Sequence, residues 1–433
     1  MRRMAVSSGL PRTREQPTTW GMLRNHPLRE RIVQEMHLRR FPPVHAPMRI
    51  LQAVRIVASA DREAEQEAVP RMPGVAPNEI SASARHAAGT TPSGVQMLWE
   101  RHSEASTATV LLPEGIEITP FIGWLEQLPG ETVRAISIAI VPTEQDAGPA
   151  LVEAALAGDD LVTCYIGDSR FWSDFRMGPD GYGRVVIAAN GTAPADLGRI
   201  VQRVQELGNY RNLALLGLPL AQEQGPMLDR LETLVAEHAL AIAEGREDDE
   251  AVLKRLSDLS AKLAQVATGT AFRLGATRAY AAIVGDRLAT LEVRAIPGHQ
   301  SLVDFNDRRL VPAVRTCANF AARLELLGDR AARVTAVLRT RIETRIERQN
   351  QDLLGSMERG IGLQIRLQSV VESLSVLAIS YYAIGLFAYI AKGISHAVPG
   401  VSADSLIAVA VIPVVVAIYV SIHRFRRKLM PPD

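Results

Sequence analysis

Between residues 49 and 190, apolar residues come in short runs that end at Pro, Gly or Asn. The runs are rich in Val and Ile, a pattern that predicts buried β-strands. The predicted strands are TATVLLP, AISIAIVP, LVTCYIG and RVVIAAN, with a helix over 150–157. Residues 61–94, rich in Ala, Ser, Pro and Glu, are predicted to form a long surface loop. Residues 23–192 are therefore expected to be an α+β or α/β domain.

From residue 193 onward the strand pattern stops and a helical pattern begins. Helices are predicted over roughly 226–243, 249–266 and 270–293, before IPGHQS interrupts the pattern. Apolar or small residues then recur every three or four positions, at Leu310, Val314, Cys317, Phe320, Leu324, Leu327, Ala331, Val334, Leu338, Ile342 and Ile346. Such a stripe packs on a partner helix. Residues 193–368 are therefore predicted to be a helical, coiled-coil-like stalk that forms a homo-oligomer.

Two segments near the C-terminus are uncharged over a length that can cross a bilayer. Nineteen residues from Ser373 to Ala391 and eighteen from Ser405 to Ile422 carry no formal charge. About twenty predominantly apolar residues span the hydrocarbon of a membrane. Transmembrane helices are therefore predicted over 369–391 and 405–423, joined by a short external loop over 392–404. The alternative is a helical hairpin buried in a soluble core.

The charges that flank these segments predict their orientation. A basic tail, 424–433, carries Arg424, Arg426, Arg427 and Lys428, whereas the loop between the segments contains one Lys. Because basic flanks stay in the cytoplasm, both termini are predicted to be cytoplasmic, with the chain in the inner (plasma) membrane. Residues 1–22 lack an apolar signal-peptide core and are predicted to be a mobile tail.

Charge and cysteine content narrow the classes of partner. The net charge is +1, so no overall field attracts nucleic acid. The two cysteines, Cys164 and Cys317, are far apart in the sequence, which disfavours a disulfide framework and fits a reducing compartment. The chain contains none of the phosphate-loop, dinucleotide, nucleophile-elbow or zinc-helix motifs, so no cofactor is expected.

Two polar segments could carry chemistry. If WERHSEAST were extended, Glu100, His102 and Glu104 would share one strand face. Two carboxylates beside a His could bind a divalent ion or transfer protons. The simpler reading is an ion-paired, solvated face. The second segment contains His26, Glu35, His37 and His45, but its spacing does not fit a local metal site, and a capped surface helix is predicted there.

Several polar or small residues lie at the start of, or within, the first uncharged segment: Glu372, Ser375, Ser380, Tyr381, Tyr382 and Gly385. Ser375 and Tyr382 are two helical turns apart and share a face. That face could line a pore, or it could pack helices together in a dry membrane interface. We expect the dry interface, because Glu372 is the single acidic residue at the mouth of such a pore.

The chain resembles the bacterial membrane-anchored proteins of domain-of-unknown-function family 3422. The resemblance is carried by NHPLRERIVQEMHLRRFPP, WERHSEAST, RRLVPAVRTCANFAARLELLGDRAARVTAVLRTRIE, RQNQDLLGSMERG and LQIRLQSVVESLSVLAISYYAIGLFAYIAKG. It implies membrane anchoring but no particular activity. The layout also looks like that of CorA-type channels, although YIAKGISHAVPG replaces their Gly-Met-Asn motif.

Three hypotheses follow for the function. The first is a membrane-anchored cytoplasmic scaffold or interaction protein that oligomerises through its long helix. The second is a divergent CorA-like channel or transporter, although charged residues are missing from the interior of both spans. The third is a membrane-bound enzyme that uses Glu100, His102 and Glu104. The sequence identifies no substrate, ion or protein partner.

Overall fold

The computed structural model describes residues 25–29, 32–33, 41–74, 84–156, 161–245, 247–397 and 402–429, with side chains for all of these except 395–397 and 426–429. The chain divides into two compact units. The sheet unit comprises Met1–Leu228 and Gln265–Glu325, and the helical unit comprises Asp229–Ala264 and Leu326–Asp433. The predicted mobile tail over 1–22 lies outside the described residues.

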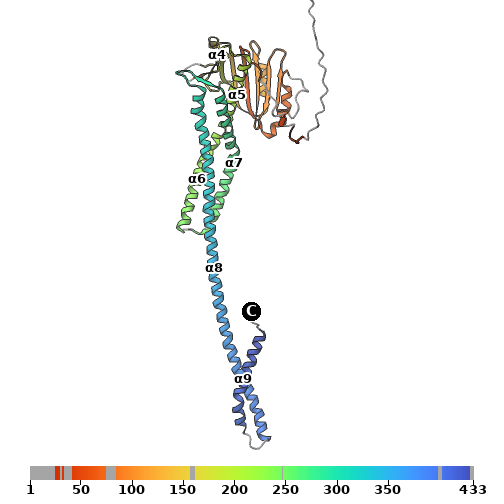
Figure 1. Ribbon diagram of the computed structural model, residues 1–433, viewed down its shortest axis with the longest axis vertical. Helices are drawn as coiled ribbons and strands as arrows, with labels where there is room; N and C mark the ends of the chain where they lie inside the picture. Colours follow the sequence, from red (N-terminus) through yellow and green to blue (C-terminus); the bar gives the residue numbers. More distant parts are fainter. Residues whose placement is uncertain are drawn as a thin grey trace, which may run out of the picture. The chain divides into compact units, whose positions relative to one another are not determined.

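The sheet unit is built on one mixed β-sheet (Figure 1). Its strands among the described residues are β1 (Met48–Ile56), β2 (His86–Thr90), β3 (Gln96–Arg101), β4 (Ala105–Pro113), β5 (Glu131–Val141), β6 (Val162–Ile166), β7 (Ser169–Ser173), β8 (Gly183–Ala188) and β9 (Val293–Ala295). They lie in the order β2-β3-β4-β1-β5-β8-β7-β6-β9. The pair β5 and β8 is parallel, and the other neighbouring pairs are antiparallel.

Helices pack on both faces of this sheet. The helices and 3-10 turns in order are η1 (Ser59–Asp61), α2 (Arg62–Ala68), η2 (Val69–Arg71), α3 (Thr119–Gln127), η3 (Glu144–Asp146), α4 (Ala147–Glu153), α5 (Pro194–Leu215), α6 (Gly217–Glu244), α7 (Asp249–Thr290), α8 (Leu302–Ala397) and α9 (Ala403–Leu429). The helix α5 covers one face, with the end of α7 and the start of α8. The helices α3 and α4 cover the other face.

The alternation of side chains along the strands explains this layering. In β5, Ile136, Ile138 and Ile140 point to the α5 face, and Ala139 and Val141 point to the α4 face. Strand β8 is apolar on both sides, as expected for a strand whose two faces are buried. The α+β fold predicted for this part of the chain, followed by long helices, is confirmed.

Helix α5 makes a close backbone contact with the segment before β1. Pro194 occupies its first turn, where the missing N–H costs nothing. The buried residues Leu197, Val201 and Val204 follow at helical spacing. A Cβ on Gly198 would lie 2.5 Å from the carbonyl oxygen of Pro42, so this position requires glycine.

Two local predictions were wrong. The segment 61–94, expected to be a surface loop, contains the helix α2 and the strand β2. These elements form because Val69, Met72 and Ala87 are buried in one apolar cluster with α3. The predicted break near residue 268 does not occur, since α7 continues through Gly269. One glycine in a helix interior costs only about 1 kcal/mol, which packing readily outweighs.

In the helical unit, the end of α6 and the start of α7 lie beside α8 (Figure 1). Their contact is an apolar cluster of Ile242, Val252, Leu256 and Leu338, with Leu253, Val334 and Ile342 at its edge. The almost fully buried Asp249 forms ion pairs with Arg341 and Arg345, at 3.4 and 2.5 Å. Leu338 and its neighbours are part of the stripe predicted from the sequence, and this part is indeed covered by partner helices.

Helix α8 is 96 residues long. Among the described residues, α8 and α9 are the two helices that are long and apolar enough to cross a membrane. Helix α9 turns back along the last part of α8 (Figure 1), where Ser380 and Ala391 are buried. Most large apolar side chains of these segments are exposed, for example Leu377, Leu386, Val409 and Ile412. Within this chain, the two apolar segments are therefore largely exposed rather than buried in a core.

Candidate functional site

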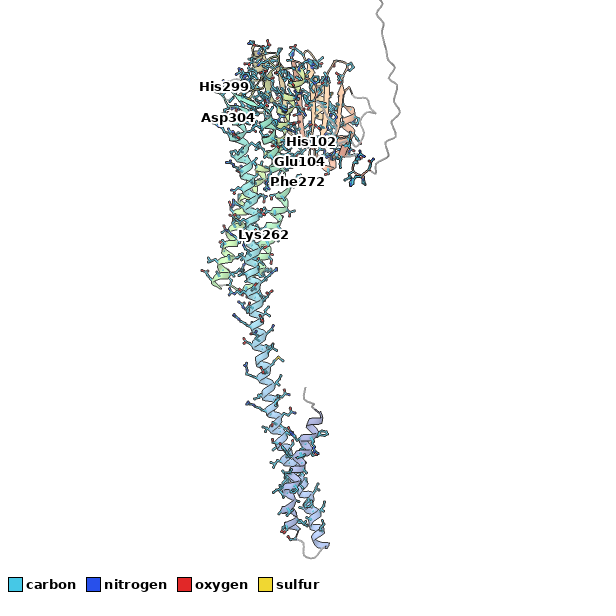
Figure 2. The ribbon with its side chains drawn as sticks, in the orientation of Figure 1. His102, Glu104, Lys262, Phe272, His299 and Asp304 are labelled. Carbon is cyan, nitrogen blue, oxygen red and sulfur yellow. The ribbon has the colours of Figure 1, made fainter. Side chains whose placement is uncertain are left out.

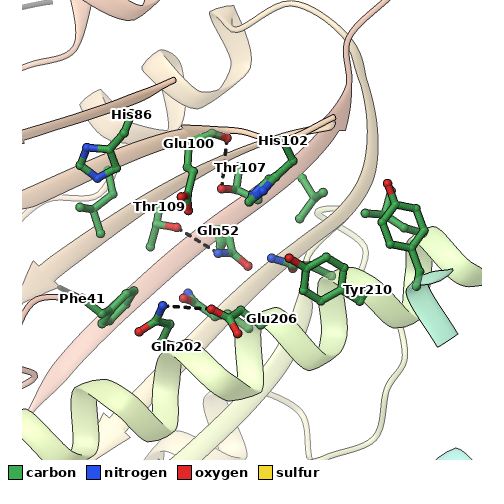
Figure 3. A pocket seen from close by; sticks show the side chains of 16 residues that line it. Phe41, Gln52, His86, Glu100, His102, Thr107, Thr109, Gln202, Glu206 and Tyr210 are labelled. Atoms are coloured by element: carbon green, nitrogen blue, oxygen red, sulfur yellow. Dashed lines mark hydrogen bonds between the residues drawn. The ribbon is translucent and has the colours of Figure 1, made fainter. Parts of the chain in front are cut away.

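A cavity of about 310 Å³ lies in the sheet unit, between the sheet and α5 (Figure 3). Its walls come from β1, β2, β3 and β4 on one side and from α5 on the other, with Tyr280 of α7 at one end. Volumes of a few hundred Å³ are typical of pockets that bind small molecules. The cavity is the candidate functional site of this unit.

The register of the strands makes the sheet side of the cavity polar. In one cross-strand row, His86 pairs with Glu100, and Glu100 pairs with Thr107. In the next row, Thr109 pairs with Gln52. Further along β4 and β1, the same face carries the apolar Leu111 and Ile50. Along β1 and β4, polar residues thus take core-facing positions beside the cavity.

Helix α5 supplies the opposite wall. Gln205 and Asn209 are four residues apart, so they lie one above the other on the buried face of α5. Gln202, Glu206 and Tyr210 lie beside them and also line the cavity (Figure 3). Glu206 accepts a hydrogen bond of 3.0 Å from Gln202, and an ion pair of 2.6 Å joins Glu206 to Arg287 of α7.

A buried arginine lies behind Gln52 and Asn209, which form the floor of the cavity. Arg134 of β5 donates to the side-chain oxygens of Gln52 at 3.2 Å and Asn209 at 2.8 Å. Its guanidinium occupies the space beside Gly208, where a Cβ would come within 2.5 Å of it. Burial lowers the pKa of Arg134, and the positive charge of Arg211 lowers it further. Two amide oxygens compensate part of the cost of burying this charge.

An ion pair lies beside Tyr280, which lines the cavity. Arg273 of α7 makes two hydrogen bonds with the carboxylate of Glu104, at 3.0 and 2.7 Å. Burial raises the pKa of the Tyr280 phenol, and the hydrogen bond with Glu104 raises it further. The paired geometry fixes the turn between β3 and β4 to α7, so Glu104 has a structural partner within the sheet unit.

The structure separates the three residues of the predicted strand face. Glu100 is in β3, but His102 and Glu104 are in the turn before β4, where the His102 N–H donates to the carbonyl of Ala105 at 2.8 Å. Glu100 and His102 line the cavity (Figure 3), whereas Glu104, which is labelled below His102 in Figure 2, is bound to Arg273. No group of three metal-ligating side chains occurs among the described residues.

The histidine-rich segment near the N-terminus is only partly described. Glu35 and His37 lie outside the described residues. His26 and His45 are exposed, and the Nδ1 atom of His26 accepts a hydrogen bond from the N–H of Leu28 at 3.2 Å. The Asn25 side-chain oxygen accepts a hydrogen bond from the guanidinium of Arg29 rather than from a backbone N–H of the predicted helix start.

The residues predicted for a membrane interface differ in exposure. Ser380 is buried, and Gly385, Tyr381 and Tyr382 are exposed. Ser375 is exposed as well, and its hydroxyl donates to the carbonyl of Val371 at 2.8 Å, within α8. Glu372 is half-buried and interacts with a neighbouring group. Serine hydroxyls that bond within their own helix fit an apolar environment.

Sequence reasoning missed most of the residues that build the cavity. The missed residues are Gln52, Thr107, Thr109, Arg134, Gln205 and Asn209. A signal was present: amide residues interrupt the apolar faces of MRILQAVRI and of RIVQRVQELGNY. Locating the cavity from that signal requires the pairing of β1 with β4, which brings together residues 57 positions apart.

Comparison with known proteins gives one match. The model of the family described as "Protein of unknown function (DUF3422)" matches residues 24–429, which is nearly the whole chain. None of the curated proteins matches the chain, and no solved structure does either.

Proposed function

The chain belongs to the DUF3422 family, and we propose that it is a membrane-anchored, self-associating protein that holds its sheet unit at the cytoplasmic surface of the inner membrane. Helices α8 and α9 are the proposed anchor, and α8 is also the proposed contact between copies. The observation that carries self-association is the exposed apolar face of α8 over residues 346–372.

The anchor is supported by the exposure of the apolar segments. Bare aliphatic side chains over two helical segments of bilayer length would be unfavourable in water, whereas lipid is a suitable solvent for them. The short connection between α8 and α9 then lies outside the membrane. The basic residues after the second segment remain inside, which also places the sheet unit in the cytoplasm.

The exposed face of α8 follows a heptad repeat that is interrupted by Asn350 and Gln364 at a and by Gly360 at d. The a positions are 350, 357, 364 and 371. The d positions are 346, 353, 360 and 367. The exposed large apolar residues at a, d, e and g are Ile346, Leu353, Leu354, Met357, Ile361, Leu363, Leu367, Val370 and Val371. Most charges lie at b, c and f instead: Arg348, Asp352, Glu358, Arg359, Arg366 and Glu372. Ile365, at b, and Glu347, at e, are the exceptions.

A second copy of the chain is the occupant that fits this face. Within the helical unit, Ile342 is the last stripe residue at the edge of the apolar cluster, and Ile346 beyond it is exposed. Copies anchored in one membrane would present residues 346–372 at the same height and in parallel. The apolar face is wider than the a and d seam of a two-stranded coiled coil, so each helix needs more than one neighbour.

The same face continues into the first uncharged segment. The next d and a positions are Leu374, Ala378, Tyr381 and Gly385. Small residues allow helices to approach closely within a bilayer, and hydroxyl groups can hydrogen-bond across the contact. This arrangement favours a packed interface between copies over a pore.

The anchor is tested by cysteine labelling in intact spheroplasts. Ser402→Cys, in the proposed external connection, is expected to react with a membrane-impermeant maleimide, because it would face the periplasm. Arg424→Cys is expected to react only after permeabilisation. The two native cysteines are free but buried, so the background should be low. Labelling of both sites from the same side would contradict the two-span anchor.

A further inference from the structure

We propose that the cavity in the sheet unit binds a small zwitterion, most simply a free α-amino acid. This inference is independent of the proposed membrane anchor and of self-association. It rests on three features: a floor of hydrogen-bond donors, an unpartnered buried amide, and carboxylates on the cavity wall.

The donors on the floor are oriented by Arg134. A guanidinium can only donate, so Gln52 and Asn209 must turn their oxygen atoms toward it. Their NH₂ groups therefore point away from Arg134. The NH₂ group of Gln52 donates to the Thr109 hydroxyl at 3.0 Å, which leaves the hydroxyl hydrogen of Thr109 for another acceptor. The buried positive charge behind these amides adds to the attraction for an anionic group.

Gln205 is the residue that points most directly to a ligand. Its side chain lines the cavity, the residue is only 2 % exposed, and its Nε2 atom has no hydrogen-bond partner. A buried amide donor without an acceptor is unfavourable. An oxygen of a bound carboxylate would remove this cost. Gln205 thus joins Thr109 and Asn209 as a third group suited to a carboxylate.

The cavity wall carries hydrogen-bond acceptors with negative charge. Glu100 and Glu206 line the cavity, and none of the described lining residues is Lys or Arg. Each carboxylate can accept several hydrogen bonds, so Glu206 retains capacity beyond its contacts with Gln202 and Arg287. Burial raises the pKa of the Tyr210 phenol, and the negative charge of Glu206 raises it further. An ammonium group would be favoured in this negative environment.

A ligand that satisfies both sides carries a carboxylate and an ammonium group on a small frame. An inorganic anion would lie near the carboxylates of Glu100 and Glu206, and a simple amine would leave the donors of the floor unpaired. A free amino acid places both groups on one carbon. The volume of about 310 Å³ leaves room for a side chain, which Phe41 and Leu98 on the cavity lining could contact.

The test is calorimetric titration of the full chain in detergent with each standard L-amino acid. At least one is expected to bind. Its amide, which lacks the carboxylate, and its N-acetyl derivative, which lacks the charged amine, are expected to bind at least about tenfold more weakly, or ~1.4 kcal/mol. Equal binding of either derivative, or binding of no amino acid, would overturn the proposal.

Variants separate recognition from folding. Gln205→Leu is expected to weaken binding at least about tenfold, while raising the melting temperature of the ligand-free protein, because a buried unpartnered donor is removed. Glu100→Gln is expected to weaken binding similarly. Glu117→Gln, an exposed residue outside the cavity lining, is the control and should change neither property. Unchanged affinity in Gln205→Leu, or a lower melting temperature, would show that this amide has only a structural role.

Discussion

Replacing Leu338 by Asp is expected to unfold the contact of α6 and α7 with α8 in the helical unit. Leu338 is fully buried, at 0 % exposure, and belongs to a cluster with Ile242, Val252 and Leu256. The change removes a buried apolar side chain and introduces a carboxylate without a partner. Together these effects should lower the free energy of unfolding by at least about 4 kcal/mol. Limited proteolysis of the full chain in detergent should then show rapid new cleavage within residues 229–264.

The neighbouring residue provides a matched control. Val337 is 62 % exposed on the same turn of α8, so Val337→Asp adds the same charge without burying it. Its proteolysis should match that of the wild type. If both variants were equally resistant, the cluster around Leu338 would not hold these helices together.

Replacing Leu353 and Leu367 together by Lys is expected to dissociate the proposed oligomer. These residues both occupy d positions of the exposed α8 face, two heptads apart, and are 58 % and 67 % exposed in the single chain. Burial of one Leu contributes about 1.5–3 kcal/mol, and each new ammonium would have to be desolvated in the interface. The dissociation constant should rise at least about 100-fold, as measured by light scattering of the full chain in detergent over a dilution series.

The control for this experiment places the same charges on the opposite face. Asp352→Lys combined with Ser369→Lys changes positions c and f, which face away from the proposed contact. This variant should keep the oligomer mass of the wild type. Loss of the oligomer in both variants would indicate a general charge effect, and loss in neither would assign the contact to another surface.

The sequence predicted the elements whose signal is local. The runs TATVLLP, AISIAIVP, LVTCYIG and RVVIAAN are strands, because β-branched residues bounded by turn residues have few alternatives. The stripe that begins at Leu310 lies on one continuous helix, α8. Its three- and four-residue spacing repeats over many turns, which makes helical periodicity the most reliable of these signals.

The cavity could not be predicted because its residues meet only through long-range pairing. Gln52 reaches Thr109 through the pairing of β1 with β4, and Asn209 reaches Arg134 across the contact of α5 with β5. Each residue alone resembles an ordinary surface residue in the sequence. Glu104 illustrates the opposite error. It was grouped with Glu100 by spacing, but the turn before β4 directs it to Arg273.

Disulfide cross-linking in native membranes tests the central claim, parallel self-association through α8, most directly. Under mild oxidation, Leu353→Cys and Leu367→Cys should each give a covalent dimer, because identical core positions of parallel helices face one another. Arg348→Cys and Arg366→Cys, at positions f and c, should remain monomeric under the same conditions. Cross-linking that is equal on both faces, or absent at both core positions, would contradict the account.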